Sequence, residues 1–185
     1  MVNQDQYLNS VFPAPPLTAF KRQRNIKDML IRAKVPAQTR RYPERKLKGM
    51  FKCGKNCSGC PYIKGEKSVK FGKNQKWTLN RKMTCENFNV IYMIECQKPE
   101  CKLRYIGESG RFLRYRLAEH RGYVVNKLTN KPTGAHFNLK GHGLSDMKII
   151  IIEQVKIQDV QYRKEREKYF INKFNTYYEG MNKKQ

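Results

Sequence analysis

Acidic residues are scarce in this 185-residue sequence: 15 Asp and Glu stand against 39 Lys and Arg, which gives a formal net charge of +24. Such an excess of one sign repels itself, so we expect a polyanionic partner whose counterions are released on binding. No apolar run approaches the roughly 18 residues of a membrane span, since the longest, residues 147–155, has the length of a strand. We therefore expect nucleic acid, and no membrane, as the partner.

The N-terminal residues 1–16 lack the charged start, the apolar core and the small-residue cleavage site of a secretory signal. We therefore expect an intracellular, reducing environment, in which the six cysteines bind metal instead of forming three disulfides. Disulfides in a secreted basic protein are the weaker alternative.

Three of the cysteines form a tight knuckle. Cys53, Cys57 and Cys60 follow a C-x3-C-x2-C spacing, and Cys85 comes a little further on. Gly54 and Gly59 would allow the sharp backbone turns that such a knuckle needs. Because structural zinc is bound tetrahedrally by thiolates, the spacing predicts a zinc site, with free buried thiols or a disulfide as the alternatives.

The chain divides into three regions. Residues 1–45 are basic and proline-punctuated, which predicts an arm or linker with a possible short helix at residues 24–33. Residues 46–88 hold the knuckle and a short apolar hairpin, and a bound metal would offset their low apolar content. Residues 89–185 have the pattern of a globular domain.

The globular region alternates strand and helix patterns. β-branched and alternating runs predict strands, and apolar residues at helical spacing predict two long helices. We therefore predict an α+β fold: a small α/β sandwich in which helices flank a three-stranded, mostly antiparallel sheet, preceded by a zinc-stapled basic extension. In chain order, the expected elements are strands at 89–96 and 102–108, a helix at 110–128, a loop at 136–144, a strand at 146–155 and a helix at 159–176.

Several polar residues recur at places where chemistry could occur. Tyr92 and Tyr105 lie at equivalent places on neighbouring strands, although a strand-end tyrosine usually belongs to the core. Arg116 and His120 are four residues apart and share one helix face, which is typical of a phosphate-binding surface. Glu167 lies on the last helix and could simply pair with Arg163 one turn before it.

Together these residues resemble the GIY-YIG endonuclease family, over residues 89–182. The resemblance rests on "VIY" at 90–92, "YIG" at 105–107, and on Arg116, His120, Glu167 and Asn182 in this order. Val90 stands where the family name has its first glycine, but a strand position does not need glycine and the functional side chain would be Tyr92.

A closer resemblance is to the endonuclease domain of Penelope-like retroelements. There "YIGE", "RLAEH", "HFN", "GH", "ERE", "FI" and "GMN" recur in this order, as do two cysteines between the tyrosine motifs. "FKRQRNIKDMLIRAKV" near the N-terminus resembles the basic tail that follows the reverse transcriptase in those elements.

The resemblance implies metal-dependent hydrolysis of phosphodiester bonds in DNA. Tyr92 or Tyr105 would assist or deprotonate the attacking water, helped by the positive charge of Arg116, whose fork also suits a phosphate oxygen. Glu167 would ligate one Mg²⁺ (or Mn²⁺) ion. His120 could position the water, share the base role or contact the phosphate. Asn182 would position the C-terminal segment.

The resemblance also implies partners for the other cysteines. Cys96 and Cys101 lie in the turn between the tyrosine strands, His136 and His142 lie in the loop after the Arg/His helix, and similar retroelement domains carry such a pair arrangement. Two cysteines and two histidines suit tetrahedral zinc. Cys85 would then complete a four-thiolate site with the first three cysteines, although an exchange of Cys85 with Cys96 stays open.

The expected function is therefore a DNA endonuclease that nicks a strand and leaves a 3′-hydroxyl able to prime reverse transcription in the nucleus. In a full element its partners would be the DNA phosphate backbone, the reverse transcriptase and its RNA template. The basic segment 70–82 would hold the backbone, with Trp77 or Phe71 free to stack on an exposed base, whereas the alternative for Trp77 is a place in the core. The alternative is a catalytically silent, zinc-stabilised nucleic-acid-binding module derived from such an element.

Overall fold

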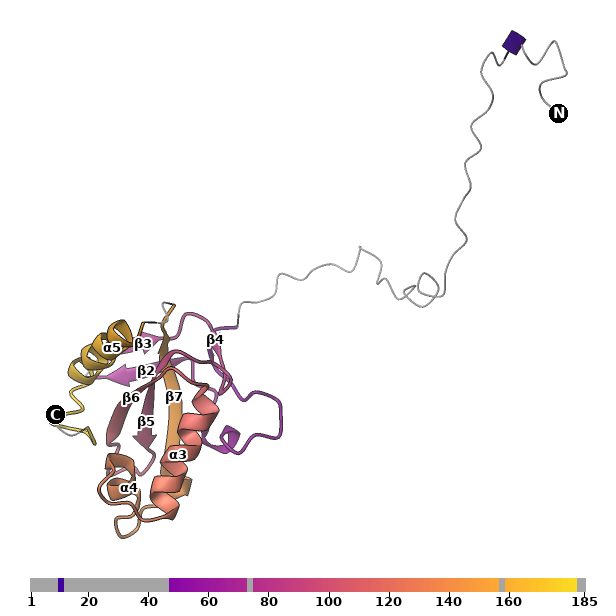
Figure 1. Cartoon of the computed structure of the whole chain (residues 1–185). Coiled ribbons are helices and arrows are strands. Elements are labelled where there is room, and N and C mark those ends of the chain that lie inside the picture. Colours follow the sequence, from indigo (N-terminus) through magenta and orange to yellow (C-terminus); the bar gives the residue numbers. More distant parts are fainter. Residues whose placement is uncertain (1–9, 12–46, 73–74, 157–158, 183–185) are drawn as a thin grey trace. The chain divides into compact units, whose positions relative to one another are not determined.

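The computed structural model describes residues 10–11, 47–72, 75–156 and 159–182 (Figure 1). The helix expected at residues 24–33, and almost all of the predicted basic arm, lie outside these residues. The fold is therefore described from residue 47 onward.

A three-stranded antiparallel sheet forms the centre of the domain. Its order is β6 (Arg104–Ser109), β5 (Val90–Cys96) and β7 (Met147–Gln154), which confirms the predicted three-stranded antiparallel sheet. Every residue of β5 is buried, because this central strand is covered on both faces. The pairing of β5 with β7 shifts register between Ile91 and Tyr92, and such an irregularity can redirect the next side chain.

Two long helices lie against this sheet, close to the predicted ranges. They are α3 (Leu113–Val125) and α5 (Val160–Lys173), and α5 contacts β5 and β6. The side chain of Asp159 caps α5 by accepting a hydrogen bond of 2.8 Å from the Gln161 amide. Among the described residues, no helix is long and apolar enough to cross a membrane.

The expected loop at 136–144 is only partly a loop. Its first two residues end a short helix, α4 (Pro132–Phe137), and Leu144 begins the 3-10 helix η3 (Leu144–Asp146). Pro132 stands at the start of α4, where its fixed φ angle and missing N–H suit a helix. A Cβ atom at Gly134 would overlap the Leu128 carbonyl oxygen, so glycine lets α4 dock closely against the preceding turn.

The extension folds as several short elements. They are β1 (Gly49–Met50), the 3-10 helix η2 (Cys60–Tyr62), β2 (Ser68–Phe71), β3 (Gln75–Thr78) and β4 (Lys82–Met83). β1 pairs in parallel with β4, and β2 pairs with β3 as the antiparallel hairpin predicted from the sequence.

The hairpin packs onto the domain through its aromatic side chains. The Trp77 indole N–H donates to the Ile152 carbonyl at 3.0 Å, and the Trp77 ring meets Phe170 of α5 edge-on at 5.1 Å. The Phe71 ring lies 4.9 Å from that of Phe174. Both rings are half-buried and used in packing, which favours the core interpretation of Trp77 over stacking on an exposed base.

Substitution of Trp77 tests this attachment. Trp77→Phe removes the indole donor and should lower the free energy of unfolding by about 1 kcal/mol. Trp77→Ala also removes the ring and should cost about 3–5 kcal/mol. Urea unfolding followed by circular dichroism measures both, with Tyr115→Ala, at a half-exposed ring, as a control expected to change stability by less than about 0.5 kcal/mol. Equal losses for Trp77→Ala and the control would show that the ring does not hold the hairpin.

Candidate active site and metal centres

A buried hydrogen-bond network centres on the hydroxyl of Tyr92. The Arg116 Nε–H donates to this oxygen at 2.9 Å, and His120 Nε2 lies 2.7 Å from it. Arg116 and His120 come from one face of α3, so a single helix brings both side chains to the strand tyrosine. Tyr92 is completely buried, and burial raises its pKa well above the ordinary value, although the charge of Arg116 opposes the rise.

The imidazole of His120 is held at both nitrogens. Its Nδ1 lies 2.9 Å from the Thr133 hydroxyl oxygen, and both residues are buried. Burial, followed by the charge of Arg116, lowers the pKa of His120 to about 3, so the ring is neutral at pH 7. A neutral ring with two partners is fixed in one orientation and shielded from solvent.

Tyr105 and Glu167 line a cleft of about 480 Å³ beside this network. Tyr105 comes from β6 and its ring lies 5.4 Å from that of His120, whereas Glu167 comes from α5. Burial raises the pKa of Tyr105 above its ordinary value, and Arg116 opposes the rise. Tyr105 is therefore the tyrosine in the cleft, and Tyr92 lies behind it.

The Glu167 carboxyl has the properties of a cation ligand. Burial, followed by the neighbouring charge of Glu108, raises its pKa to about 7, and Arg116 opposes the rise. Arg163 does not pair with Glu167, as the simpler interpretation had it: Arg163 forms an ion pair with Glu108 and donates to the Asn89 side-chain oxygen at 2.7 Å. The hard oxygen of a half-buried carboxylate in an open cleft fits Mg²⁺ or Mn²⁺.

Asn182 joins the C-terminal segment to β6. Its side-chain oxygen accepts from the Ile106 amide at 2.9 Å, and its side-chain nitrogen donates to the Ile106 carbonyl at 2.8 Å. Since Ile106 follows Tyr105 directly, these bonds position the strand that carries the cleft tyrosine.

Sequence reasoning missed three residues at this site. Lys164 and Lys168 line the cleft one helical turn apart on α5. Their four-residue spacing in "KEREK" could have indicated that both lysines lie on one face of the helix. No sequence pattern marks Thr133, because its contact with His120 depends on how α4 docks.

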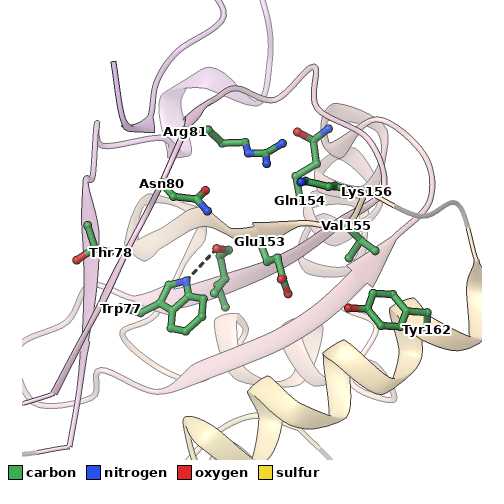
Figure 2. A pocket seen from close by; sticks show the side chains of 10 residues that line it. Trp77, Thr78, Asn80, Arg81, Glu153, Gln154, Val155, Lys156 and Tyr162 are labelled. Carbon is green, nitrogen blue, oxygen red and sulfur yellow. Dashed lines mark hydrogen bonds between the residues drawn. The ribbon is translucent and has the colours of Figure 1, made fainter. Parts of the chain in front are cut away.

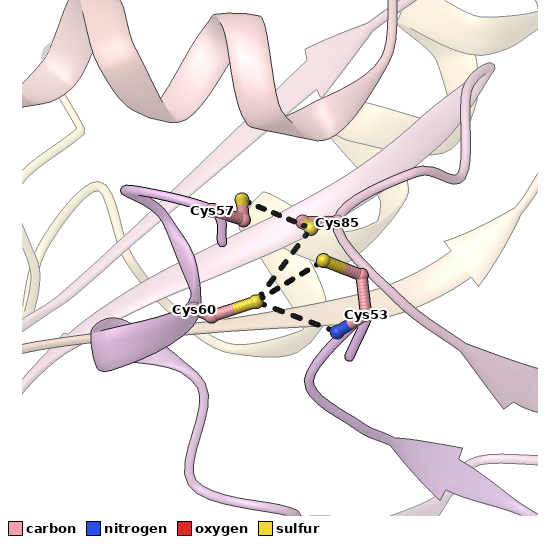
Figure 3. Close-up of side chains that lie close together, drawn as sticks. All are labelled: Cys53, Cys57, Cys60 and Cys85. Carbon is pink, nitrogen blue, oxygen red and sulfur yellow. Dashed lines mark hydrogen bonds between the residues drawn. The ribbon is translucent and has the colours of Figure 1, made fainter. Parts of the chain in front are cut away.

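Four cysteine sulfurs gather in the extension (Figure 3). The Sγ atoms of Cys53 and Cys60 are 3.4 Å apart, those of Cys57 and Cys85 are 3.5 Å apart, and those of Cys60 and Cys85 are 4.0 Å apart. Zinc–sulfur bonds of about 2.3 Å place tetrahedral sulfurs about 3.8 Å apart, so this group could hold zinc. All of these cysteines are free thiols.

The first cluster supports the start of α3. Phe112 provides no side-chain cap for this helix, and its first amides instead find backbone acceptors beside the cluster. The Leu113 N–H donates to the Asn87 carbonyl and the Arg114 N–H to the Cys85 carbonyl, both at 2.9 Å. The helix that carries Arg116 and His120 is therefore anchored on the segment that holds the first cysteine cluster.

The two glycines of the knuckle have different roles. Gly54 has a φ of +77°, which is the left-handed turn expected there. Gly59 lies in the expected turn, which the Cys60 N–H closes by donating to the Cys57 carbonyl at 3.1 Å, but its φ of −88° is open to any residue. A Cβ atom at Gly59 would lie 2.8 Å from the Leu117 side chain, so glycine is needed for the close approach of α3.

The second cluster joins Cys96, Cys101, His136 and His142, with the ligand atoms within 4.8 Å of one another. Cys101 Sγ lies 3.5 Å from His136 Nε2. Both ring nitrogens of His142 are buried and have no hydrogen-bond partner within the described residues, a costly state that a metal ligand would relieve. The donor set fits zinc, and the grouping places Cys85 in the first cluster and Cys96 in the second.

Metal content tests the two clusters. We expect the purified chain to carry about two zinc ions, and Cys101→Ser and Cys85→Ser each to lower that number to about one. Elemental analysis, alongside thermal melts with and without chelator, measures this. Chelation should lower the melting temperature, because a metal that binds only the folded state stabilises it. A parent protein with one zinc ion or none would contradict the two-site arrangement.

A comparison with known protein families identifies a family that matches this part of the chain. The family model of the GIY-YIG catalytic domain matches residues 88–183, which include the Tyr92 network, the cleft and the second cluster. No curated protein and no solved structure matches the chain. GIY-YIG domains are nuclease domains that act on DNA. Because the match covers more than half of the sequence, the chain belongs to the GIY-YIG nuclease family.

Proposed function

We propose that the chain is a divalent-metal-dependent DNA endonuclease that nicks one strand and leaves a 3′-hydroxyl. The observation that carries the proposal is the Arg116–Tyr92–His120 network directly behind a cleft that holds Tyr105 and Glu167. In this reaction a water oxygen attacks phosphorus while the bond from phosphorus to the 3′ oxygen breaks. The products are a 5′-phosphate and a 3′-hydroxyl.

Tyr105 and Tyr92 have different roles in the proposed reaction. Tyr105 lines the cleft, so we assign it to the attacking water. A phenol is a weak base at neutral pH unless a cation stabilises its phenolate, and Arg116 supplies that charge to both tyrosines. Tyr92 stays buried and holds Arg116 and His120 in place.

Thr133 takes part in the proton arrangement that we propose for this network. With the His120 proton on Nδ1 and donated to the Thr133 hydroxyl, Nε2 is an acceptor for the Tyr92 hydroxyl proton. The Tyr92 oxygen then keeps its lone pairs toward the Arg116 Nε–H. This chain of contacts keeps Arg116 directed at the tyrosines.

Glu167 and Arg116 would meet the charge of the phosphate. Arg116 donates through Nη1 to Glu119 at 2.6 Å, and its charge also reaches Tyr105 in the cleft, where it would attract a phosphate oxygen. Glu167 would hold Mg²⁺ or Mn²⁺, which supplies charge neutralisation at the phosphate and the leaving oxygen. Lys164 and Lys168 would bind neighbouring phosphates of the same strand.

The proposal extends to the biological setting. The ordered motifs from "YIGE" to "GMN", together with two separate metal clusters, support descent from a Penelope-like retroelement. In that setting the nick would prime reverse transcription in the nucleus, with the reverse transcriptase and its RNA template as partners.

Plasmid nicking tests the activity. With Mg²⁺, the parent should convert supercoiled plasmid to a nicked form that DNA ligase reseals, since resealing needs a 3′-hydroxyl and a 5′-phosphate. Glu167→Gln and Tyr105→Phe should each lower the rate by at least about a hundredfold. Glu165→Gln, in the same cleft, and Tyr115→Phe, on the outer face of α3, are matched controls that should keep the rate. Binding without nicking by the parent would instead identify a catalytically silent DNA-binding module.

Substitution of Thr133 tests the proton arrangement. Thr133→Val keeps the side-chain shape but leaves His120 Nδ1 buried without a partner, so kcat should fall about tenfold or more. Thr133→Ser should restore it, and Thr129→Val, at an exposed threonine in the preceding turn, should have no effect. Nitrogen chemical shifts of the His120 ring report the tautomer. An unchanged tautomer in Thr133→Val would show that the hydroxyl acts only through packing.

A further inference from the structure

The β2–β3 hairpin has two unlike faces. The pair Val69 and Trp77 points inward, toward the core contacts described above. The neighbouring pairs, Lys70 with Lys76 and Ser68 with Thr78, must point outward because side chains alternate along a strand. Lys70, Lys76 and Thr78 are exposed accordingly.

The outward face carries unbalanced positive charge. Lys70 and Lys76 are direct cross-strand partners, an arrangement that destabilises a hairpin when the charges are alike. Neither lysine forms an ion pair with any described residue, and residues 67–85 contain no Asp or Glu. This repulsion has no compensation within the described fold, but a polyanion bound to the face would remove it.

The same face leads into a groove. Residues 76, 78 and 80 alternate outward along the strand and its continuation, and Thr78 and Asn80 reach a groove of about 300 Å³ beside β7 (Figure 2). Arg81 and Lys156 also line it. Its one carboxylate, Glu153, is already neutralised by Arg166 at 2.8 Å, so the groove presents an excess of hydrogen-bond donors and positive charge.

Packing contacts and a hydrogen bond hold the hairpin and the base of the groove against the domain. The Trp77 indole bond to Ile152 lies at the base of the groove, and Phe71 and Trp77 pack on α5 (Figure 2). Lys173 of α5 lies 4.9 Å from the centre of the Trp77 ring on the inward side. Because its backbone is held by these contacts, the hairpin needs no rearrangement of the backbone to meet a ligand.

We propose that this surface, which we term the hairpin strip and define as Lys70, Lys76, Thr78, Asn80, Arg81 and Lys156, binds the phosphate backbone of duplex DNA outside the catalytic cleft. α5 separates the two: Tyr162 lines the groove, whereas Gln161 and Lys164 line the cleft. One duplex can therefore contact both flanks of α5. The strip would hold the DNA away from the bond that is cut, and the inference rests on the proposed DNA substrate.

Salt-dependent binding tests the strip. We would measure duplex DNA binding by fluorescence anisotropy in EDTA, with no cleavage, for the parent, Lys70→Gln/Lys76→Gln and Arg81→Gln. Each phosphate contact that is lost should reduce the slope of log K against log salt by about 0.9, so the double variant should lose about 1.8. Nicking at saturating DNA should stay unchanged, because none of these residues lines the cleft.

A control that removes the same charge elsewhere tests whether DNA binding depends on the hairpin strip or on positive charge anywhere on the surface. Lys127→Gln/Lys140→Gln removes two exposed lysines near α4, at the other end of the domain from β2 and β3 (Figure 1), and should leave the slope unchanged. An equal loss of slope in this control would overturn the strip, as would a defect confined to RNA duplexes. If the parent binds DNA through the strip but never nicks it, the proposed activity fails and the strip stands.

Discussion

The N-terminus of α3 is the constraint on which the active site depends. A helix begins with amides that need acceptors, and α3 has no side-chain cap. The acceptors are the carbonyls of Cys85 and Asn87, on the segment that closes the first cysteine cluster. Glu86 strengthens the junction by pairing with both Lys55 of the knuckle and Arg114 of the helix. A metal in this cluster therefore acts on Arg116 and His120 through the helix that carries them.

The second cluster acts on the same network from the other side. α4 has six residues, too few for a helix to be stable alone. Within it, His136 belongs to the cluster and Thr133, one turn earlier, holds His120. Fixing His136 with a metal would thus fix the hydroxyl that orients the imidazole. Both clusters lie far in sequence from Glu167. Each is nevertheless connected to the Tyr92 hydroxyl, the first through the helix that carries Arg116 and the second through Thr133 and His120.

Local pattern was enough to predict the sheet, the two long helices and the Cys53, Cys57 and Cys60 knuckle, because alternation, helical spacing and cysteine spacing are properties of short stretches of sequence. The ligands of the second cluster came from the family resemblance. Local pattern was not enough for contacts that depend on docking. The six residues of α4 contain too little periodicity to indicate a helix. Gly59 lies in its predicted turn, but the close approach of Leu117 from a distant helix could not be predicted. Arg163 pairs with Glu108 on β6 and with the buried Asn89 before β5 instead of with the carboxylate one turn away on its own helix, a choice of partners that depends on how α5 docks on the sheet.

The two motif tyrosines differ because their strands differ. β5 is central, so Tyr92 is enclosed, whereas β6 is an edge strand and leaves Tyr105 beside the cleft. Gly107, the cross-strand partner of Tyr92, makes the enclosure possible: a Cβ atom there would lie 2.6 Å from the Tyr92 hydroxyl and 2.8 Å from the Tyr105 ring. Gly107 of the second motif is therefore needed to leave room for the Tyr92 side chain of the first motif. With that space, Tyr92 reaches between Arg116 and His120, and Tyr105 is free to face the substrate.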